Sequence, residues 1–321
     1  MTERLYILEE VDPSIFIGHN KANLVLLSNL FPKLRLVAHS NVLKVLGEQE
    51  ETESFLAVVS KLEAFCAKYN RLNEEDIIRV VHGEQEPKAP QHLILYGVNG
   101  KPIIAKSNNQ KRLVDAFDRD DLLFAIGPAG SGKTFIAISL AVKALKTKQV
   151  RRIILSRPAV EAGEKLGFLP GEMKDKLDPY LQPLYDALGE MIPGAKLREY
   201  IENGTIQIAP LAYMRGRTLS DAVVILDEAQ NTTIHQMKMF LTRLGLGAKM
   251  IITGDTTQID LPRGVSSGLI RALKILDGTD GISMIHLTKA DIVRHPLVER
   301  IVEAYEGYKE EETYRTTNKI K

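Results

Sequence analysis

Two kinds of hydrophobic pattern divide the chain. In the larger, C-terminal part, short runs of β-branched and other apolar residues alternate with stretches of helical spacing. This alternation predicts an α/β fold in which helices wrap a parallel sheet. The expected strands are Leu122–Ile126, Arg152–Ser156, Thr205–Ala209, Ala222–Leu226, Lys249–Thr253 and Ile282–His286.

The N-terminal part, up to about residue 70, predicts a small α/β unit. A helix carrying Leu24, Leu27 and Phe31 precedes two strands, Leu34–Ala38 and Val42–Leu46. A longer helix follows, and its apolar residues recur at three- and four-residue spacing, which makes one continuous face. This face comprises Phe55, Val58, Val59, Leu62, Phe65, Cys66 and Tyr69. The one cysteine is therefore expected to pack as a small apolar side chain.

Residues 71–106 read as connecting chain between the two parts. Glu84–Pro90 has the composition of a linker. Leu93–Tyr96 and Lys101–Ile104 flank an Asn99-Gly100 turn, which predicts a β-hairpin. The expected domains are residues 1–85 and 86–308, and residues 309–321 are expected to form a polar, mobile tail.

Composition narrows the functional classes. The chain has 321 residues, 44% hydrophobic and 26% charged, as in ordinary globular proteins. Its 42 basic and 41 acidic residues give a net charge of +1, so any binding of nucleic acid must come from a local patch. A single cysteine excludes an intrachain disulfide. No signal pattern and no apolar run of membrane length occurs, so we expect a cytoplasmic protein with no membrane partner.

One loop carries recognisable chemistry. It follows Leu122–Ile126 and reads Gly127, Pro128, Ala129, Gly130, Ser131, Gly132, Lys133 and Thr134. A glycine-rich loop between a strand and a helix directs backbone N–H groups at a phosphate. Lys133 is placed to reach the β- and γ-phosphates of a nucleotide, and the Thr134 hydroxyl is placed to bind Mg²⁺. The flanking strand and helix favour this interpretation over a glycine-rich turn that binds nothing.

A pair of carboxylates follows the buried strand Ala222–Leu226. Asp227, at the end of this strand, can hold Mg²⁺ directly or through water. Glu228 is placed to orient or deprotonate an attacking water. The glutamate therefore suggests hydrolysis rather than transfer of the phosphoryl group to another acceptor.

A second polar loop, Gly254–Asp260, follows the strand Lys249–Thr253. A loop in this position lies at the carboxyl edge of the sheet, where open α/β folds bind their ligands. Gln258 is a candidate sensor of the γ-phosphate. The alternative is an ordinary turn closed by Gly254 and Asp255.

Together these motifs resemble a known family. The loop Gly127–Thr134, the stretch Asp227–Gln230 and the stretch Gly254–Gln258 are similar to motifs I, II and III of superfamily-1 helicases. Further resemblance to the PhoH-like ATPases is carried by Ser156–Glu164, Arg215–Leu219 and Asp291–Val298. The similarity extends from about residue 93 to residue 307.

The resemblance implies a RecA-like P-loop core that binds ATP and Mg²⁺. Its parallel sheet would have the order 5-1-4-3-2, with helices on both faces and the strand before Gly254 between the strands of the two Walker motifs. It also implies a role in RNA metabolism and, as a partner, a ribosome-maturing endoribonuclease. Such relatives carry a KH-like N-terminal segment, but Gly18-His19-Asn20-Lys21 lacks the second glycine of the KH loop. RNA contact there and a docking role both stay open.

Two single residues gain roles from the resemblance. Gln110 lies 17 residues before Gly127, like the glutamine that reads adenine in helicase Q motifs, and would favour ATP over GTP. A capping or surface glutamine is the alternative. Arg294 resembles the arginine that neutralises charge on the transferring phosphoryl group. Its alternative is a surface arginine before a helix that starts at Pro296.

Three more arginines, Arg157, Arg215 and Arg217, are candidates for contacts with RNA or a neighbouring subunit, or else for surface ion pairs. The length after residue 93 suffices for one RecA-like domain only. We therefore expect a homo-oligomeric ring, for example a hexamer, in which a neighbour supplies an arginine. The leading hypothesis is a Mg²⁺-dependent ATPase that acts on, or is regulated by, single-stranded RNA, either as an RNA-dependent ATPase or as a helicase-like ring translocase. The rival is a nucleotide-gated adaptor of the endoribonuclease with slow hydrolysis.

Overall fold

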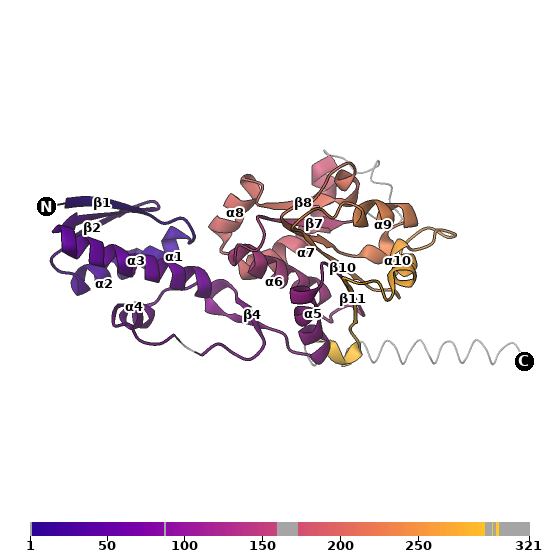
Figure 1. Cartoon of the computed structure of the whole chain (residues 1–321), viewed down its shortest axis with the longest axis horizontal. Helices are drawn as coiled ribbons and strands as arrows, with labels where there is room; N and C mark the ends of the chain where they lie inside the picture. Colours follow the sequence, from indigo (N-terminus) through magenta and orange to yellow (C-terminus); the bar gives the residue numbers. More distant parts are fainter. Residues whose placement is uncertain (1, 87, 159–172, 293–296, 298–299, 302–321) are drawn as a thin grey trace, which may run out of the picture.

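A three-stranded antiparallel sheet and a six-stranded parallel sheet organise the two parts of the chain (Figure 1). The computed structural model describes residues 2–86, 88–158, 173–292, 297 and 300–301. The predicted tail, residues 309–321, and the predicted helix starting at Pro296 lie outside the described residues. Among the helices that are described, none is both long and apolar enough to cross a membrane.

The N-terminal sheet has the strand order β1-β3-β2, and helices pack on it. Its strands are β1 (Thr2–Ile7), β2 (Arg35–His39) and β3 (Val42–Gly47). The helices of this unit are α1 (Pro13–Ile17), α2 (Ala22–Leu30), α3 (Gln49–Tyr69) and α4 (Glu74–Val81). The strands β2 and β3 and the long helix α3 confirm the sequence prediction, and Cys66 lies buried in the core as expected.

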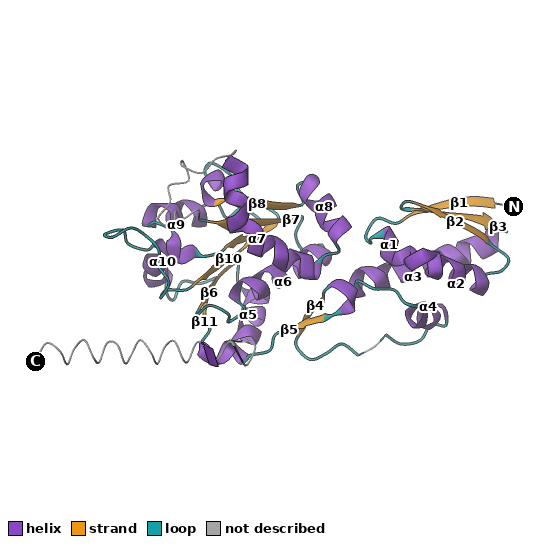
Figure 2. Ribbon diagram, turned by 180° about the vertical axis from the view of Figure 1, so that it is seen from behind, coloured by secondary structure: helices purple, strands orange, loops and turns teal. Residues whose placement is uncertain are grey.

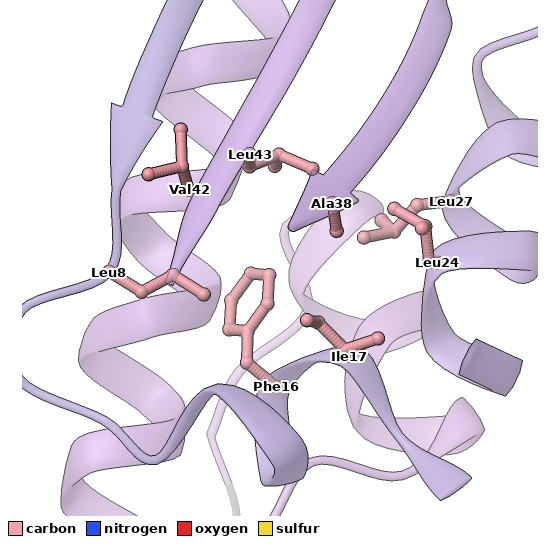
Figure 3. A pocket seen from close by; sticks show the side chains of 8 residues that line it. All are labelled: Leu8, Phe16, Ile17, Leu24, Leu27, Ala38, Val42 and Leu43. Carbon is pink, nitrogen blue, oxygen red and sulfur yellow. The ribbon is translucent and has the colours of Figure 1, made fainter. Parts of the chain in front are cut away.

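The core of this unit is apolar. Figure 3 shows side chains from α1, α2, β2 and β3, together with the residue that follows β1, around a small pocket. These side chains are Leu8, Phe16, Ile17, Leu24, Leu27, Ala38, Val42 and Leu43. Phe16 is 2% exposed and Leu27 is 1% exposed, so the pocket is part of the packed interior.

Three elements near the N-terminus were not predicted. The strand β1 has exposed Leu5 and Ile7, so its apolar residues do not mark a buried face. The interpretation of residues 71–106 as connecting chain was wrong over α4, a helix of 8 residues. Its start is fixed by a capping box in which Asn73 and Asp76 each bond the other's backbone N–H. The third element is the short helix α1.

The predicted hairpin is present. Its strands are β4 (Leu93–Tyr96) and β5 (Pro102–Ile104), which pair antiparallel. The turn between them places Asn99 at φ 57° and Gly100 at φ 72°, the left-handed region that these two residue types tolerate.

The parallel sheet has the order β11-β6-β10-β9-β7-β8. Its strands are β6 (Leu122–Ile126), β7 (Arg152–Arg157), β8 (Ile206–Pro210), β9 (Ala222–Leu226), β10 (Lys249–Gly254) and β11 (Ile282–His286). Five of them, β11-β6-β10-β9-β7, reproduce the predicted order 5-1-4-3-2, and β8 extends the sheet at its edge. The strand β10 lies between the strands of the two Walker motifs, as expected.

Helices cover both faces of this sheet (Figure 2). The first face is covered by α5 (Asn108–Arg119), α6 (Lys133–Lys146), α7 (Met173–Met191) and α8 (Gly194–Glu202). The second face is covered by α9 (Ile234–Leu241) and α10 (Gly268–Leu276). Side chains alternate between the faces, and the central strands are buried on both, which explains their uninterrupted apolar sequence.

The helix α6 links the two parts of the chain. Lys146, at its C-terminal end, donates hydrogen bonds to the carbonyl of Ala67 (3.1 Å) and to Oδ1 of Asn70 (2.9 Å), at the end of α3. The Asn70 amide in turn donates to the carbonyls of Tyr96 (2.8 Å) and Met191 (3.0 Å). A cleft of about 600 Å³ lies beside this junction.

Candidate nucleotide-binding site

The loop between β6 and α6 has the conformation that phosphate binding requires. Gly130 and Gly132 both lie at φ 81°, a region that side chains with a Cβ disfavour. A Cβ on Gly127 would lie 2.5 Å from the Leu287 carbonyl oxygen, so only glycine fits there. The Nζ of Lys133 donates to the Pro128 carbonyl (2.8 Å), which folds the lysine back over the loop. The whole predicted loop is therefore assembled at the start of α6.

Lys133 is a buried cation, with 9% of its surface exposed. Burial lowers its pKa, while the negative charges of Asp255, Glu228 and Asp227 act in the opposite direction. A phosphate group bound in the loop would favour the charged ammonium in the same way. The lysine thus fits an anionic ligand on physical grounds as well as by its motif.

The two residues predicted to hold Mg²⁺ meet in the structure. The Thr134 hydroxyl donates to Oδ1 of Asp227 at 2.6 Å. The Thr253 hydroxyl, at the end of β10, donates to the same oxygen at 2.6 Å. Asp227 is 4% exposed. A hydroxyl and a carboxylate side by side are hard oxygen donors, the ligands that Mg²⁺ prefers.

Buried polar atoms without partners support this fit. Among the described residues, Oδ2 of Asp255 and Oγ of Ser156 are buried and have no hydrogen-bond partner. Burial lowers the pKa of Lys133, and the negative charge of Asp255 raises it. Ser156 lies on β7 and pairs with the last residue of β9. Native proteins rarely leave such groups unsatisfied. A hydrated metal ion at the site would offer a hydrogen-bond donor to the Asp255 oxygen.

Glu228 has an unusual backbone conformation. It lies at φ 52° and ψ 39°, in the left-handed region, which a residue other than glycine adopts at an energetic cost. Its Oε2 accepts a hydrogen bond from the Gln230 amide at 2.5 Å. Gln230 also accepts from the backbone N–H of Asp255 at 3.0 Å. The conformation is therefore held in place by the next strand of the sheet.

The loop after β10 contributes Asp255 rather than Gln258 to the buried site. Oδ1 of Asp255 accepts hydrogen bonds from the backbone N–H and the hydroxyl of Thr257. Gln258 has an exposed side chain, and its N–H donates to the Asp255 carbonyl at 3.2 Å, as in a turn. A role for Gln258 in sensing the γ-phosphate stays a prediction.

Gln110 lies under the loop and is 4% exposed. It forms a capping box with Ser107 at the start of α5. Its Oε1 accepts from the N–H of Lys106 (2.8 Å), and its Nε2 donates to the Ser131 carbonyl (3.1 Å). The structure thus gives Gln110 the capping position that the sequence left open as the alternative. Adenine recognition by this residue stays a prediction.

The predicted arginines separate in space. Arg157 is half-buried at the end of β7, with Nη2 at 3.3 Å from Oε1 of Glu228 and Nε at 3.8 Å from Oδ2 of Asp227. Arg215 is exposed, and Arg217 donates to the Gln207 side chain at 2.7 Å. Arg294 lies outside the described residues. Arg157 therefore belongs to the site, in contact with the carboxylates rather than at the surface.

Sequence reasoning missed the parts played by Thr253, Gln230 and Arg157. Each is a polar residue at or just beyond the end of a buried strand, and that position was the available signal. Which of them touch Asp227 and Glu228 depends on which strands are neighbours. The strands β10 and β7 flank β9, so their ends surround the two carboxylates.

Comparison with known proteins identifies relatives of this chain. The family model of the PhoH-like proteins matches residues 102–306. A PhoH-like protein of Bacillus subtilis (strain 168) is 47% identical over 95% of this chain and 99% of its own length. A PhoH-like protein of Synechocystis sp. is 48% identical over 85% of both chains.

More distant similarity occurs among solved structures. The Pif1 helicase from Candida albicans matches 63% of this chain and 43% of its own, with 16% identity and a TM-score of 0.34. The assignment of the chain to a family rests instead on the sequence relatives, one of which matches 95% of this chain, and on the geometry of the phosphate loop described above. The chain therefore belongs to the PhoH family of P-loop proteins.

Proposed function

We propose that this protein binds Mg-ATP at the loop Gly127–Thr134 and hydrolyses it in the service of RNA metabolism. One observation carries the proposal. The hydroxyls of Thr134 and Thr253 converge on one oxygen of Asp227, each at 2.6 Å, beside a buried lysine. Phosphate loop, metal carboxylate and the strand between them thereby form one site, as ATP hydrolysis requires.

The residues divide the work. Backbone N–H groups of the loop and Lys133 would bind the β- and γ-phosphates and stabilise negative charge that moves during bond cleavage. Thr134 and Asp227 would hold Mg²⁺, which supplies Lewis-acid neutralisation of the phosphate oxygens. Glu228 would accept a proton from the attacking water. Its side chain, 36% exposed, lies beside Asp227 and within reach of solvent.

A ring assembly would complete the site for hydrolysis. One parallel sheet provides one nucleotide face, so an arginine completing the charge around the γ-phosphate would come from a neighbouring copy. Arg294 is the candidate that the resemblance supplies. A homo-oligomer, for example a hexamer, follows as part of this proposal. Light scattering with and without ATP measures the oligomeric state. A monomer under both conditions would exclude an arginine supplied by a neighbouring copy.

Single-stranded RNA is the proposed substrate of the assembly. The turn Gly18–Lys21 joins α1 to α2, and its residues His19, Asn20 and Lys21 are exposed. Asn20 and Lys21 both have positive φ, at 50° and 62°. A tight turn with exposed polar and cationic groups suits contact with a phosphate backbone, although it lacks the second glycine of the KH loop.

A second candidate function is that of a nucleotide-gated adaptor for a ribosome-maturing endoribonuclease. One observation favours it. The helix α6 has 14 residues, which corresponds to a length of about 20 Å. It begins at the phosphate loop and ends at Lys146, whose side chain donates to the Ala67 carbonyl of the N-terminal unit. A shift of α6 on nucleotide binding would therefore reach a surface remote from the nucleotide.

Hydrolysis measurements separate these functions. We expect wild-type protein to release phosphate from ATP with Mg²⁺, and Lys133→Ala to lose this activity while its circular dichroism spectrum stays unchanged. Lys143→Ala, on the same helix, is the matched control and should keep the activity. Stimulation by single-stranded oligouridylate supports the RNA-dependent ATPase, whereas slow hydrolysis that RNA does not change favours the adaptor. Equal activity of Lys133→Ala and wild type would refute the site.

A further inference from the structure

Asp255 is the first residue after β10, and its backbone is tied to both neighbouring strands. The N–H of Gly127, at the start of the phosphate loop, donates to the carbonyl of Gly254 at 3.1 Å. The N–H of Asp255 donates to Oε1 of Gln230, in the turn after β9, at 3.0 Å. Asp255 is therefore fixed between the loop that would hold phosphate and the turn that carries the two carboxylates.

The side chain of Asp255 is held through one of its two oxygens. Oδ1 accepts hydrogen bonds from the backbone N–H of Thr257 (2.9 Å) and from the Thr257 hydroxyl (2.7 Å). Oδ2 is buried and has no hydrogen-bond partner among the described residues, and the whole residue is 5% exposed. A buried carboxylate oxygen is costly unless it accepts a hydrogen bond or meets a cation. The orientation of Asp255 is thus set in advance, with one acceptor available.

Two observations place this acceptor beside the proposed metal site. Asp255 comes two residues after Thr253, and residues at this spacing project from the same face of a strand. The Thr253 hydroxyl donates to Oδ1 of Asp227 at 2.6 Å. Burial lowers the pKa of Lys133, and Asp255 has the largest effect of the acids that oppose this shift. The Asp255 carboxylate is therefore close to the lysine that would bind the phosphates.

The position of Asp255 along the chain favours a contact with the metal through water. At the rise of a strand, Asp255 lies about 6.6 Å beyond Thr253. Two oxygens that bind one Mg²⁺ directly lie at most about 4.2 Å apart, twice the metal–oxygen distance. A bound water extends this reach by one hydrogen bond of about 2.8 Å. Mg²⁺ usually keeps several of its waters in proteins, and such a water can donate to Oδ2.

The charge of Asp255 has the opposite effect on a nucleotide without metal. Phosphate groups at Lys133 would face a buried carboxylate, and like charges repel more strongly where water is excluded. Arg157 offsets part of the charge of the other two acids, at 3.3 Å from Glu228 and 3.8 Å from Asp227. Among the described residues, Oδ2 of Asp255 has no hydrogen-bond partner of its own. Asp255 therefore disfavours bare phosphates and favours phosphates that carry a hydrated cation.

We propose that Asp255 makes the site selective for the magnesium complex of the nucleotide. Its Oδ2 accepts a hydrogen bond from a water on Mg²⁺, and its charge repels phosphates that arrive without the metal. The inference rests on the proposed binding of Mg-ATP and names the residue that decides between the two forms of the nucleotide. It involves hydrogen bonding and charge alone, and no covalent bond forms or breaks.

One isosteric substitution and one control test the selectivity. Asp255→Asn keeps an oxygen for Thr257 and replaces the other oxygen by an amide group, which is neutral and donates instead of accepting. Asp260→Asn removes an equal charge from the same loop, where the exposed Asp260 accepts from the Asn231 side chain at 3.2 Å. Calorimetry measures the affinity for adenylyl imidodiphosphate, an ATP analogue that is not hydrolysed, with Mg²⁺ and with EDTA. Thermal melting verifies that each variant is folded.

We expect wild type to bind the analogue more tightly with Mg²⁺ than with EDTA. Asp255→Asn should weaken binding with Mg²⁺ by about tenfold, the loss of one supporting contact to a metal. With EDTA it should strengthen binding by about threefold or more, the repulsion of two unit charges about 7 Å apart in water. Asp260→Asn should match wild type under both conditions. A substitution that only disturbed the loop would not shift the two affinities in opposite directions.

Contrary outcomes are distinguishable. If Asp255→Asn weakens binding equally with Mg²⁺ and with EDTA, the residue has a structural role and the selectivity is wrong. Unchanged affinities with a lower rate of ATP hydrolysis also overturn the selectivity and assign Asp255 to the attacking water. Equal binding of the analogue by wild type with and without the metal overturns it as well. In all three cases the proposed ATP site stands, whereas no binding by wild type under either condition removes the proposed function together with the inference.

Discussion

Thr253 offers a sharp test of the metal site because its side chain is fully buried, with 0% exposure. Its hydroxyl donates to Oδ1 of Asp227 at 2.6 Å. Thr253→Val keeps the shape of the side chain and removes the donor. Thr253→Ser keeps the donor and removes a methyl group, so it is the matched control.

The size of the effect follows from the surroundings of Asp227. A hydrogen bond to a charged group contributes about 1.5–3 kcal/mol, and at 4% exposure water cannot easily replace it. The Thr134 hydroxyl also donates to this oxygen, but it is the proposed Mg²⁺ ligand and would turn away when the metal binds. Asp227 would then depend on Thr253 for its orientation. Loss of such a supporting bond typically weakens metal affinity by about 10- to 100-fold.

Two measurements apply to wild type and both variants. Thermal unfolding should show a melting temperature several degrees lower for Thr253→Val, and the Mg²⁺ concentration that gives half-maximal ATP hydrolysis should rise by about 10- to 100-fold. Thr253→Ser should lose about 1 kcal/mol of stability, from one methyl group, and keep the Mg²⁺ dependence. The reasoning is refuted if Thr253→Val matches wild type in both measurements, or if Thr253→Ser shows the same Mg²⁺ defect.

Three further outcomes are expected. Gly132→Ala should destabilise the protein by about 1–2 kcal/mol because Gly132 lies at φ 81°, and it should weaken ATP binding in calorimetry. Gly278→Ala, at φ 72° in open space, should show the strain alone, and equal ATP affinities in the two variants would contradict this. Burial raises the pKa of the Cys66 thiol to about 12, so a disulfide reagent at pH 8 should modify it only after denaturation, and rapid modification of native protein would contradict the packing. Burial lowers the pKa of Lys146 to about 8. The charged form of Lys146 is therefore disfavoured in the folded state. As the pH rises from about 8 to 10, the free energy of unfolding of wild type, measured by denaturant titration, should increase relative to that of Lys146→Met by about 1–3 kcal/mol. A decrease over this pH range would contradict the prediction.

The central strands could be predicted almost residue by residue. Leu122–Ile126 and Ala222–Leu226 were expected with the bounds that the structure has. A strand buried on both faces is apolar throughout, so its sequence has few other interpretations. The strand β1 was not predicted because Leu5 and Ile7 are exposed, and α4 was not predicted because 8 residues offer little periodicity.

Local sequence by itself determined the phosphate loop, its lysine, and the pair Asp227-Glu228, because each motif acts through residues that are close along the chain. Tertiary structure alone decided that Thr253, Gln230 and Arg157 surround those carboxylates. Their contacts arise from the order of strands, in which β10 and β7 flank β9, and that order is set by packing between distant segments. The sequence indicated the chemistry of the site, but only the tertiary structure showed which side chains contact its two carboxylates.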